Sequence, residues 1–269
     1  MDYTLRFSLV SMATAGREVN EDNFIANRIY RDVRQGSYCR LTGEVKVNRN
    51  SKPVFGVFDG MGGGGMSNAS VASLLAAQNA EELVLDDLVE EDEENQLYRF
   101  FVSTNEDILQ FAYRHGIMYM GTTAALAVFT PKRILIANAG DTRIYEINDR
   151  DMRQITKDHV LPEYEDSPLT QYLGMHPYEG WLDPYIVYKQ SISPGERYLI
   201  CSDGVYGYVN DENMREIILS SEGYIEKVEE MISRAIANGS MDDMTCVLLE
   251  IQCNMEDEKS ARGKQCSEQ

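Results

Sequence analysis

The feature that most constrains the fold is a short apolar run that ends in an aspartate and a glycine-rich segment. Residues 54–58 are apolar and include β-branched and aromatic side chains, which predicts a buried strand. Asp59 follows directly, and five glycines stand among the next six residues, so the backbone can turn sharply and approach a ligand. Residues 68–85 then predict a helix. Such a loop can hold a cation or a phosphate group.

The glycine-rich segment formally matches a dinucleotide-binding fingerprint. Gly60, Gly62 and Gly65 have the G-x-G-x-x-G spacing between a predicted strand and a predicted helix. However, Asp59 would place a carboxylate beside the pyrophosphate, and an acidic segment follows the helix where a parallel strand is required. A Walker loop is excluded because no Gly-Lys-Ser/Thr follows. A cation site is therefore favoured.

Composition limits the kinds of partner. The 269 residues carry 44 acidic and 25 basic side chains, for a formal net charge of −19. This charge repels nucleic acid and anionic membranes, so neither is expected as a partner. Five cysteines without a C-x-x-C pair indicate free thiols, and no apolar run reaches membrane-spanning length. We expect a cytoplasmic monomer with one domain over residues 1–253 and a disordered tail over 254–269.

The order of the predicted elements favours antiparallel sheets. Strands are expected at 3–12, 24–30, 54–58, 122–129, 133–139, 143–147, 154–156, 186–192, 196–201 and 245–252, and helices at 68–85, 96–115, 211–220 and 224–237. This order leaves too few crossovers for a doubly wound parallel sheet. Residues 86–94, seven of which are acidic, are expected to form a solvated loop.

One basic stretch interrupts the acidic chain. Residues 28–52 contain seven basic and two acidic side chains. The favoured interpretation is a solvated hairpin or loop before the central strand. The alternative is a docking surface for a phosphorylated or acidic partner.

Acidic residues recur where predicted strands begin or end. They are Glu21, Asp22, Asp59, Asp141, Asp203 and Asp242. Each one alone is only a turn signal. If the strand ends converge, however, the carboxylates form a cage of the oxygen ligands that Mg²⁺ and Mn²⁺ prefer. The prediction of a cation site therefore rests on the six residues together.

Seven ordered motifs carry a resemblance to a known family. They are Arg17-x-x-Asn20-Glu21-Asp22, Phe58-Asp59-Gly60-Met61-Gly62-Gly63, Gly121-Thr122-Thr123-Ala124, Asn138-Ala139-Gly140-Asp141-Thr142-Arg143, Thr156-x-Asp158-His159, Ser202-Asp203-Gly204 and Asp242-Asp243-Met244-Thr245. Over residues 6–252 the sequence resembles the metal-dependent serine/threonine protein phosphatases, the PPM or type 2C family. It is most similar to the bacterial branch, in which Asp-Gly-Met-Gly-Gly replaces the Asp-Gly-His-Gly-Gly of many eukaryotic members.

The resemblance implies a fold and a metal centre. The fold is α+β, a four-layer α-β-β-α sandwich of two antiparallel sheets flanked by helix pairs. Two or three Mn²⁺ or Mg²⁺ ions would bind at one end. Asp59 would bridge two ions, the carbonyl of Gly60 would bind one of them, and Asp203 and Asp242 would bind the other. Asp141, with Asp203, would match the third-metal site of bacterial members.

The resemblance also implies a mechanism for phosphoserine and phosphothreonine hydrolysis. Arg17 would clamp the phosphate, Glu21 and Asp22 would orient waters on the metals, and a water activated by two cations would attack phosphorus in line. Two features depart from the family pattern. Met61 cannot donate a proton, so the general acid is unassigned. The segment after His159 is also shorter than the flap of bacterial relatives, which leaves substrate recognition open.

Three functions follow for testing. The favoured one is a signalling phosphatase that acts on phosphorylated proteins, with a cognate serine/threonine kinase as a partner. The alternative is a catalytically weak relative that serves as a regulatory or phospho-dependent binding module, although the intact carboxylate set argues against it. A third is a partner-switching phosphatase that acts on one small regulatory protein.

Overall fold

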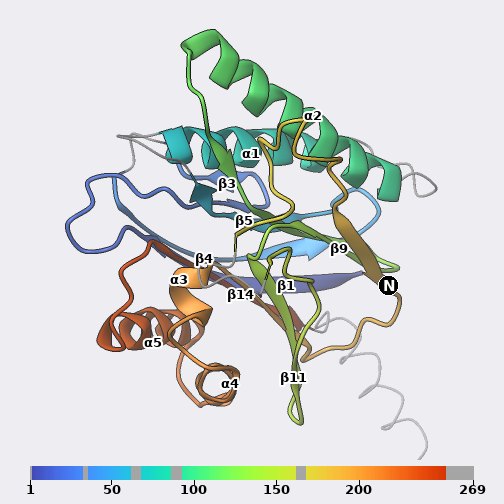
Figure 1. Cartoon of the computed structure of the whole chain (residues 1–269). Helices are drawn as coiled ribbons and strands as arrows, with labels where there is room; N and C mark the ends of the chain where they lie inside the picture. The colour runs from blue at the N-terminus through green and yellow to red at the C-terminus, as the bar shows by residue number, and fades with distance from the viewer. Residues whose placement is uncertain (1, 33–35, 62–67, 86–92, 162–167, 253–269) are drawn as a thin grey trace, which may run out of the picture.

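The computed structural model describes residues 2–32, 36–61, 68–85, 93–161 and 168–252. Two six-stranded antiparallel sheets lie face to face, and helices cover both outer faces (Figure 1). The expected α+β sandwich of four layers is thereby confirmed. No helix in the described ranges is long and apolar enough to cross a bilayer.

The first sheet joins the two ends of the described chain. Its strand order is β11-β10-β13-β14-β1-β4. The strands are β1 (Tyr3–Met12), β4 (Tyr38–Val47), β10 (Arg143–Ile147), β11 (Met152–Gln154), β13 (Arg197–Cys201) and β14 (Met244–Gln252). β1 and β14 are antiparallel partners, from Thr4 opposite Gln252 to Met12 opposite Met244. The first and last described strands therefore lie side by side.

The second sheet contains the strand that precedes Asp59. Its order is β12-β9-β8-β5-β2-β3. The strands are β2 (Asn23–Ala26), β3 (Ile29–Tyr30), β5 (Val54–Phe58), β8 (Ala124–Phe129), β9 (Ile134–Ala139) and β12 (Tyr185–Lys189). β5 is antiparallel to both of its neighbours, β2 and β8, so it is not part of a dinucleotide-binding βαβ unit. Beyond β5, the short strands β6 (Gly60–Met61) and β7 (Gly121–Thr122) form a two-stranded ribbon.

Two groups of helices cover the sheets. Helices α1 (Asn68–Leu85) and α2 (Glu93–His115) pack on the second sheet, and α3 (Asp203–Tyr206), α4 (Asp211–Leu219) and α5 (Tyr224–Ala237) pack on the first. All four predicted helices are confirmed. α2 begins three residues before the expected 96, because Glu93 and Glu94 belong to its first turn. The rest of the predicted acidic loop, residues 86–92, lies outside the described residues.

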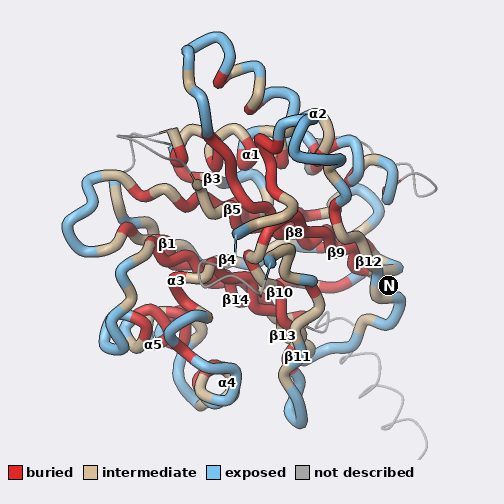
Figure 2. Tube along the Cα trace, in the orientation of Figure 1, coloured by how far each residue is buried: buried red, intermediate tan, exposed pale blue. Residues whose placement is uncertain are grey.

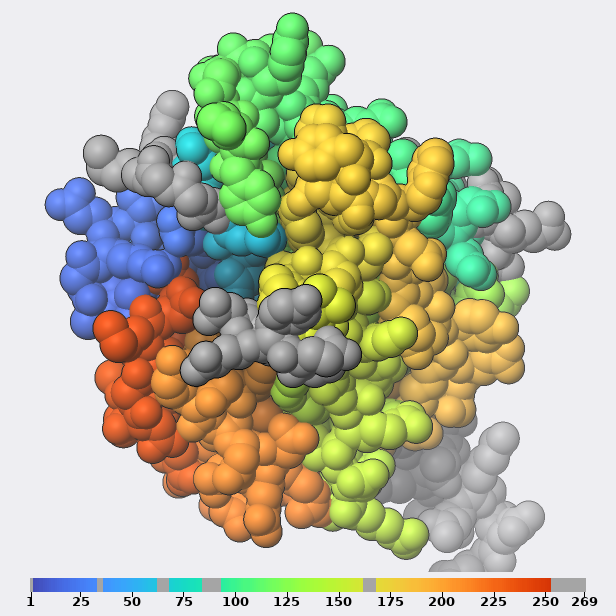
Figure 3. All heavy atoms as spheres, viewed as in Figure 1, coloured from blue at the N-terminus to red at the C-terminus, as the bar shows by residue number. Residues whose placement is uncertain are grey.

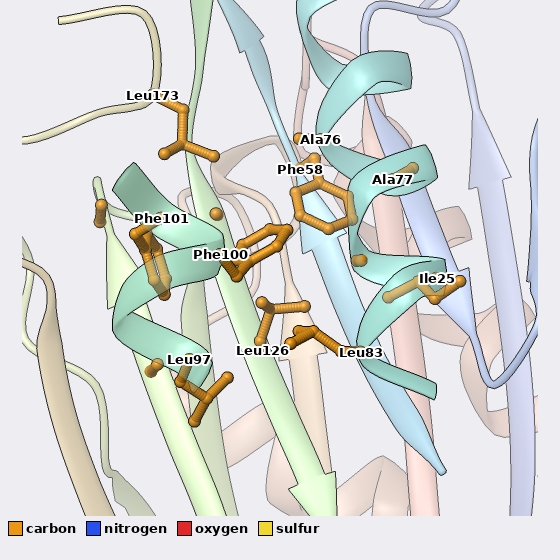
Figure 4. Packing of buried hydrophobic residues seen from close by; sticks show 14 of the residues in the cluster. Ile25, Phe58, Ala76, Ala77, Leu83, Leu97, Phe100, Phe101, Leu126 and Leu173 are labelled. Atoms are coloured by element: carbon orange, nitrogen blue, oxygen red, sulfur yellow. The ribbon is translucent and has the colours of Figure 1, made fainter. Parts of the chain in front are cut away.

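Three apolar layers hold the sandwich together, and they follow the strands as the buried parts of the tube in Figure 2. Between the sheets, the ring of Phe129 packs edge-on against Phe55 at 6.1 Å and Tyr198 at 5.8 Å. Figure 4 shows the layer under α1 and α2, where the fully buried Ala76 and Ala77 let α1 approach β5 closely. Burial of each large apolar side chain in these layers stabilises the folded state by about 1.5–3 kcal/mol.

One arginine of the basic stretch at 28–52 is buried inside the protein. Ten residues of this stretch form β4, an edge strand of the first sheet. Arg31 is only 1% exposed, and its guanidinium donates to the carbonyls of Asn20 and Asp22 at 2.6 Å each. The expectation of a solvated hairpin is wrong for Arg31, and the docking-surface alternative loses one of its charges to the interior.

Candidate metal centre

The predicted acidic residues converge at one end of the sandwich. Asp59 directly follows β5, and its pKa is raised well above the usual range. Burial is the largest cause, followed by the negative charges of four neighbouring carboxylates. These are Asp22, Asp203, Asp141 and Asp242, in order of decreasing effect. Because such effects weaken with distance, strand ends from both sheets meet here.

Within the part of the chain that the structure describes, two of these carboxylates have a buried oxygen without a hydrogen-bond partner. Asp22 is 0% exposed; its Oδ2 accepts a hydrogen bond from the Ser202 hydroxyl at 2.7 Å, but its buried Oδ1 has no partner among the described residues. Within the same ranges, the buried Oδ1 of Asp203 also lacks a partner. Burial raises the pKa of Asp22 to about 8 and is likewise the main cause that raises the pKa of Asp203. A buried carboxylate in this state is costly unless a cation or a proton joins it.

Asp141 lies after β9, next to a compact ion pair. Burial, and then the charge of Asp203, raise the pKa of Asp141 to about 6. The neighbouring Arg143 binds both oxygens of Asp158, with Nη2 to Oδ2 at 2.6 Å, and its guanidinium lies 3.8 Å from the ring centre of Tyr206. Asp158 is thus engaged in this ion pair. Its ion pair occupies Arg143 and leaves the Asp141 carboxylate as the acidic group at this position.

The backbone around Asp59 is fixed by the neighbouring strand. The Asp59 N–H donates to Thr123 Oγ1 at 3.0 Å, and its carbonyl accepts from the Thr123 N–H at 2.8 Å. Thr123 therefore has a structural role. At Gly60, an added Cβ would lie 2.5 Å from the carbonyl oxygens of Glu21 and Ala69, so no larger residue fits there.

Arg17 lies at the rim of the carboxylate cluster, where its side chain is 41% exposed. Its Nη1 donates to Glu21 Oε2 at 3.0 Å and to Asp242 Oδ1 at 3.3 Å, and it lies 3.4 Å from Asp243 Oδ2. The structure therefore brings the predicted phosphate clamp to the predicted metal ligands. In the arrangement seen, three carboxylates hold the guanidinium, and phosphate binding by Arg17 stays a prediction.

Asp243 organises the site, although it was not among the acidic residues singled out from the sequence. It is 2% exposed and accepts the backbone N–H groups of Thr14 at 2.8 Å and Glu21 at 2.6 Å, both more than 220 positions away. These bonds fix the loop that carries Arg17 onto the start of β14. A signal was available, because successive residues that enter a strand point to opposite sides. This alternation predicts that Asp242 and Asp243 face opposite sides.

The donor set fits hard cations, although it is not a finished coordination sphere. Across the described ranges, no group of three or more His, Cys, Asp or Glu side chains is arranged to hold an ion by itself. Carboxylates without a cation between them repel one another, and burial together with neighbouring carboxylates raises the pKa of Asp59 and Asp203. Oxygen donors and two buried oxygens without partners match the preferences of Mg²⁺ and Mn²⁺. The metal roles of individual residues remain predictions.

Sequence comparison identifies relatives of known class. The family model "Protein phosphatase 2C" matches residues 27–165. Serine/threonine phosphatase stp of Listeria innocua is 30% identical over 230 residues, which cover 77% of this chain and 88% of the relative. Protein phosphatase PhpP of Streptococcus pneumoniae is 26% identical over 227 residues, 78% of this chain and 90% of that protein.

Solved structures share the fold. The serine/threonine phosphatase PstP/Ppp of Mycobacterium tuberculosis has a TM-score of 0.74 and 24% identity over 93% of this chain and 99% of that one. A further structure of the PstP catalytic domain, with a TM-score of 0.74, is a complex with two manganese ions. The two-sheet sandwich and its acidic end define the class of metal-dependent phosphatases. This chain belongs to the protein phosphatase 2C family, as the motifs in its sequence indicated, and its relatives are bacterial.

Proposed function

We propose that this chain is a Mn²⁺- or Mg²⁺-dependent phosphatase that removes phosphate from phosphoserine and phosphothreonine in proteins. Family membership gives the class, a metal-dependent phosphoprotein phosphatase. The observation that carries the proposal is the convergence of carboxylates at one end of the sandwich. They are Asp22, Asp59, Asp141, Asp203 and Asp242.

The proposed metal ligands come from both sheets. Asp59 and the carbonyl of Gly60 would hold one ion, Asp59 would share a second with Asp203 and Asp242, and Asp141 with Asp203 would form a third site. In support, the buried Oδ1 of Asp203 has no other partner within the described ranges. Bound cations offset the charge of the phosphoryl oxygens and lower the pKa of a nearby water. Mn²⁺ and Mg²⁺ use the same oxygen donors, so either ion fits this set.

The chain's own residues bind and orient the substrate. Arg17 at the exposed rim would bind the phosphate with its forked guanidinium. Glu21 and Asp22 would orient the attacking water through their carboxylates. Asp243 would keep Arg17 and Glu21 in place through its bond to the Glu21 N–H. Met61 in β6 cannot supply a proton to the leaving oxygen, so that proton comes from another group.

The proposed partners follow from this activity. The substrates are phosphorylated proteins, and a serine/threonine kinase would supply them in a signalling pathway. The net charge of −19 disfavours nucleic acid and anionic membranes. We place the protein in the cytoplasm as a monomer, with residues 1–253 as the phosphatase domain; the tail predicted at 254–269 lies outside the described residues. The alternative, a catalytically weak regulatory module, has less support because such a module does not need every carboxylate of the set.

Hydrolysis of p-nitrophenyl phosphate and of a phosphothreonine peptide tests the proposal. Both reactions should require Mn²⁺ or Mg²⁺ and should stop when EDTA is added. Isothermal titration of the EDTA-treated protein with Mn²⁺ gives an independent measure of metal binding. Metal binding without any turnover would support the regulatory module instead, and the absence of both would refute the metal centre.

A further inference from the structure

Two loops beside the candidate metal centre expose large apolar side chains. Met118 and Tyr119, which follow α2, are 101% and 42% exposed. Tyr178 and Trp181, which precede β12, are 81% and 91% exposed, and Trp181 is the chain's one tryptophan. We call Met118, Tyr119, Tyr178 and Trp181 the aromatic ridge. A cluster of exposed apolar side chains on a highly charged protein indicates a binding surface.

Both loops are attached to the ribbon that carries Gly60 and Met61. In this ribbon, Gly121 of β7 lies opposite Met61 of β6, and Tyr119 is two residues before Gly121. On the other side of β7, Thr122 and Leu173 exchange two backbone hydrogen bonds of 2.9 and 2.8 Å. The loops that carry the ridge are therefore connected through backbone pairing to β6, the short strand that directly follows Asp59.

The two loops also contact each other. The ring of Tyr119 lies 6.2 Å from the ring of Tyr172, and the Tyr172 hydroxyl donates to Glu179 Oε1 at 2.7 Å. Glu179 also accepts the His176 N–H at 2.7 Å, and the His176 ring stacks on Tyr178 at 4.3 Å. Figure 3 shows the segments after α2 (green) and around residue 176 (yellow) side by side on one face of the molecule.

Hydrogen bonds hold this second loop against the fold. The side chain of Asn105 on α2 accepts the Gly174 N–H at 2.8 Å and donates to the Met175 carbonyl at 3.1 Å. Gln171 donates to the Trp181 carbonyl at 3.2 Å and accepts the Asp183 N–H at 2.7 Å. The exposed rings thus project from a braced backbone, and a ligand that binds them does not have to order the loop first.

We propose that the aromatic ridge binds the segment of the phosphoprotein substrate next to the phosphorylated residue, and that it selects segments with an apolar or aromatic side chain there. This inference rests on the proposed function and names its substrate preference. Arg17 is tied to the first sheet through Asp243, whereas the ridge is tied to the β6–β7 ribbon. Because Gly60 and Met61 of this ribbon directly follow Asp59, a substrate segment that brings its phosphate to the carboxylates would pass the ribbon that carries the ridge. Aromatic side chains suit this task because they bury much area with few rotatable bonds.

The test compares two phosphothreonine peptides that differ only in one residue beside the phosphothreonine, leucine in one and serine in the other. For the unmodified protein with Mn²⁺, kcat/KM should be about tenfold higher for the leucine peptide. In the double variant Tyr178→Ser, Trp181→Ala this preference should fall to about twofold, while hydrolysis of p-nitrophenyl phosphate is unchanged. Tyr98→Ser on α2 is the matched control, because Tyr98 is 45% exposed and outside the ridge. The control should keep the full preference.

Three results would overturn the proposal. The first is an unchanged peptide preference in the double variant, and the second is an equal loss on the peptide and on p-nitrophenyl phosphate. The third is a concentration-dependent dimer that the double variant abolishes without any change in peptide kinetics, since the ridge would then bind a second copy. A protein that hydrolyses neither peptide nor ester with Mn²⁺ fails the proposed function itself. Fluorescence of Trp181 still tests the ridge in that case: a blue shift should occur with the leucine peptide, and the same shift with both peptides would overturn the selectivity.

Discussion

Buried carboxylates have different surroundings at the two ends of the sandwich. Glu93, the first residue of α2, lies at the end of the second sheet where β5 and β9 begin. It is 4% exposed, and its two oxygens each face a cation. Arg133 Nε lies 2.8 Å from Oε2, and Lys52 Nζ lies 3.8 Å from Oε1. Where the same strands end, Asp22 and Asp203 each have an oxygen without a partner among the described residues, and their neighbours are other carboxylates. Carboxylates are thus paired with cations at one end of the sandwich and lie next to one another at the other end.

The paired carboxylate at one end supports the fold, whereas the clustered carboxylates at the other end belong to the candidate site. A buried charge that is paired within the chain contributes to one defined fold, and its removal leaves its partners exposed to the same cost. A cluster of like charges destabilises the fold and persists only where another component, here a proton or a cation, offsets it. The comparison predicts that changes at the two ends affect different measurements.

The largest effect is expected for Asp203→Asn. Turnover of p-nitrophenyl phosphate with Mn²⁺ should fall by more than about 100-fold, because even groups one shell removed from a metal affect activity by ~10–100-fold. Thermal unfolding in EDTA should not show a loss of stability, since the variant removes one of several repelling carboxylates. A fully active variant would refute the metal assignment of Asp203.

A smaller loss is expected for Arg17→Ala. Removal of a charged donor to the phosphate should lower kcat/KM for p-nitrophenyl phosphate by about 10–100-fold. Arg17→Lys should restore only part of this, because an ammonium group lacks the forked geometry. If Arg17 only offsets the charges of Glu21 and Asp242, kinetics will be unchanged and only the melting temperature will fall.

The pH dependence of stability in EDTA should reveal the unpaired end. The pKa of Asp22 is raised to about 8 and that of Asp141 to about 6, whereas both are near 3.9 in an unfolded chain. The folded state therefore keeps protons that the unfolded state releases, and stability is lost as the pH rises from about 4 to about 8. The melting temperature in EDTA should therefore fall by at least several degrees over this range, since 1 kcal/mol corresponds to about 2–4 °C for a domain of this size. Saturating Mn²⁺ should reduce the fall, and an identical slope with and without the metal would contradict the interpretation.

Glu93→Gln should affect stability alone. Arg133 and Lys52 would lose their buried partner, which should lower the free energy of unfolding by about 1.5–3 kcal/mol. Denaturant unfolding measures this change, and Mn²⁺-dependent turnover of the folded variant should equal that of the unmodified protein. A loss of turnover without a loss of stability would show that the two ends are not independent.

Regular elements with strong local patterns could be predicted from the sequence. The helices at 68–85 and 224–237 and the strand at 54–58 have the expected bounds, because apolar periodicity and flanking polar residues define each one locally. The short helix α3, which begins at Asp203, was missed because four residues carry no periodic signal. The sequence predicted β4 only as part of a hairpin or loop. Exposed and half-buried residues alternate along β4 because it lies at the edge of a sheet, so it does not have the pattern of a buried strand.

The candidate site shows the same division. The acidic residues could be found because each stands close to the beginning or the end of a predicted strand, and their convergence follows from the antiparallel topology. Arg31 and Asp243 could not be placed, since their partners are set by tertiary packing: Arg31 reaches carbonyls of the preceding loop, and Asp243 binds backbone groups near the other end of the chain. A charge pattern alone does not distinguish a buried arginine from a solvated one.

The pairing of β1 with β14 has a consequence for biosynthesis. β1 is made first, but one of its two partner strands, with the adjoining Asp242 and Asp243, is made last. At ~5–20 residues per second, roughly 10–50 s separate the two strands on the ribosome. During that interval one edge of β1 and one edge of β13 are open, and the loop that carries Arg17 has no anchor. Until this last strand closes the first sheet, both edges stay unpaired and the proposed metal centre lacks Asp242.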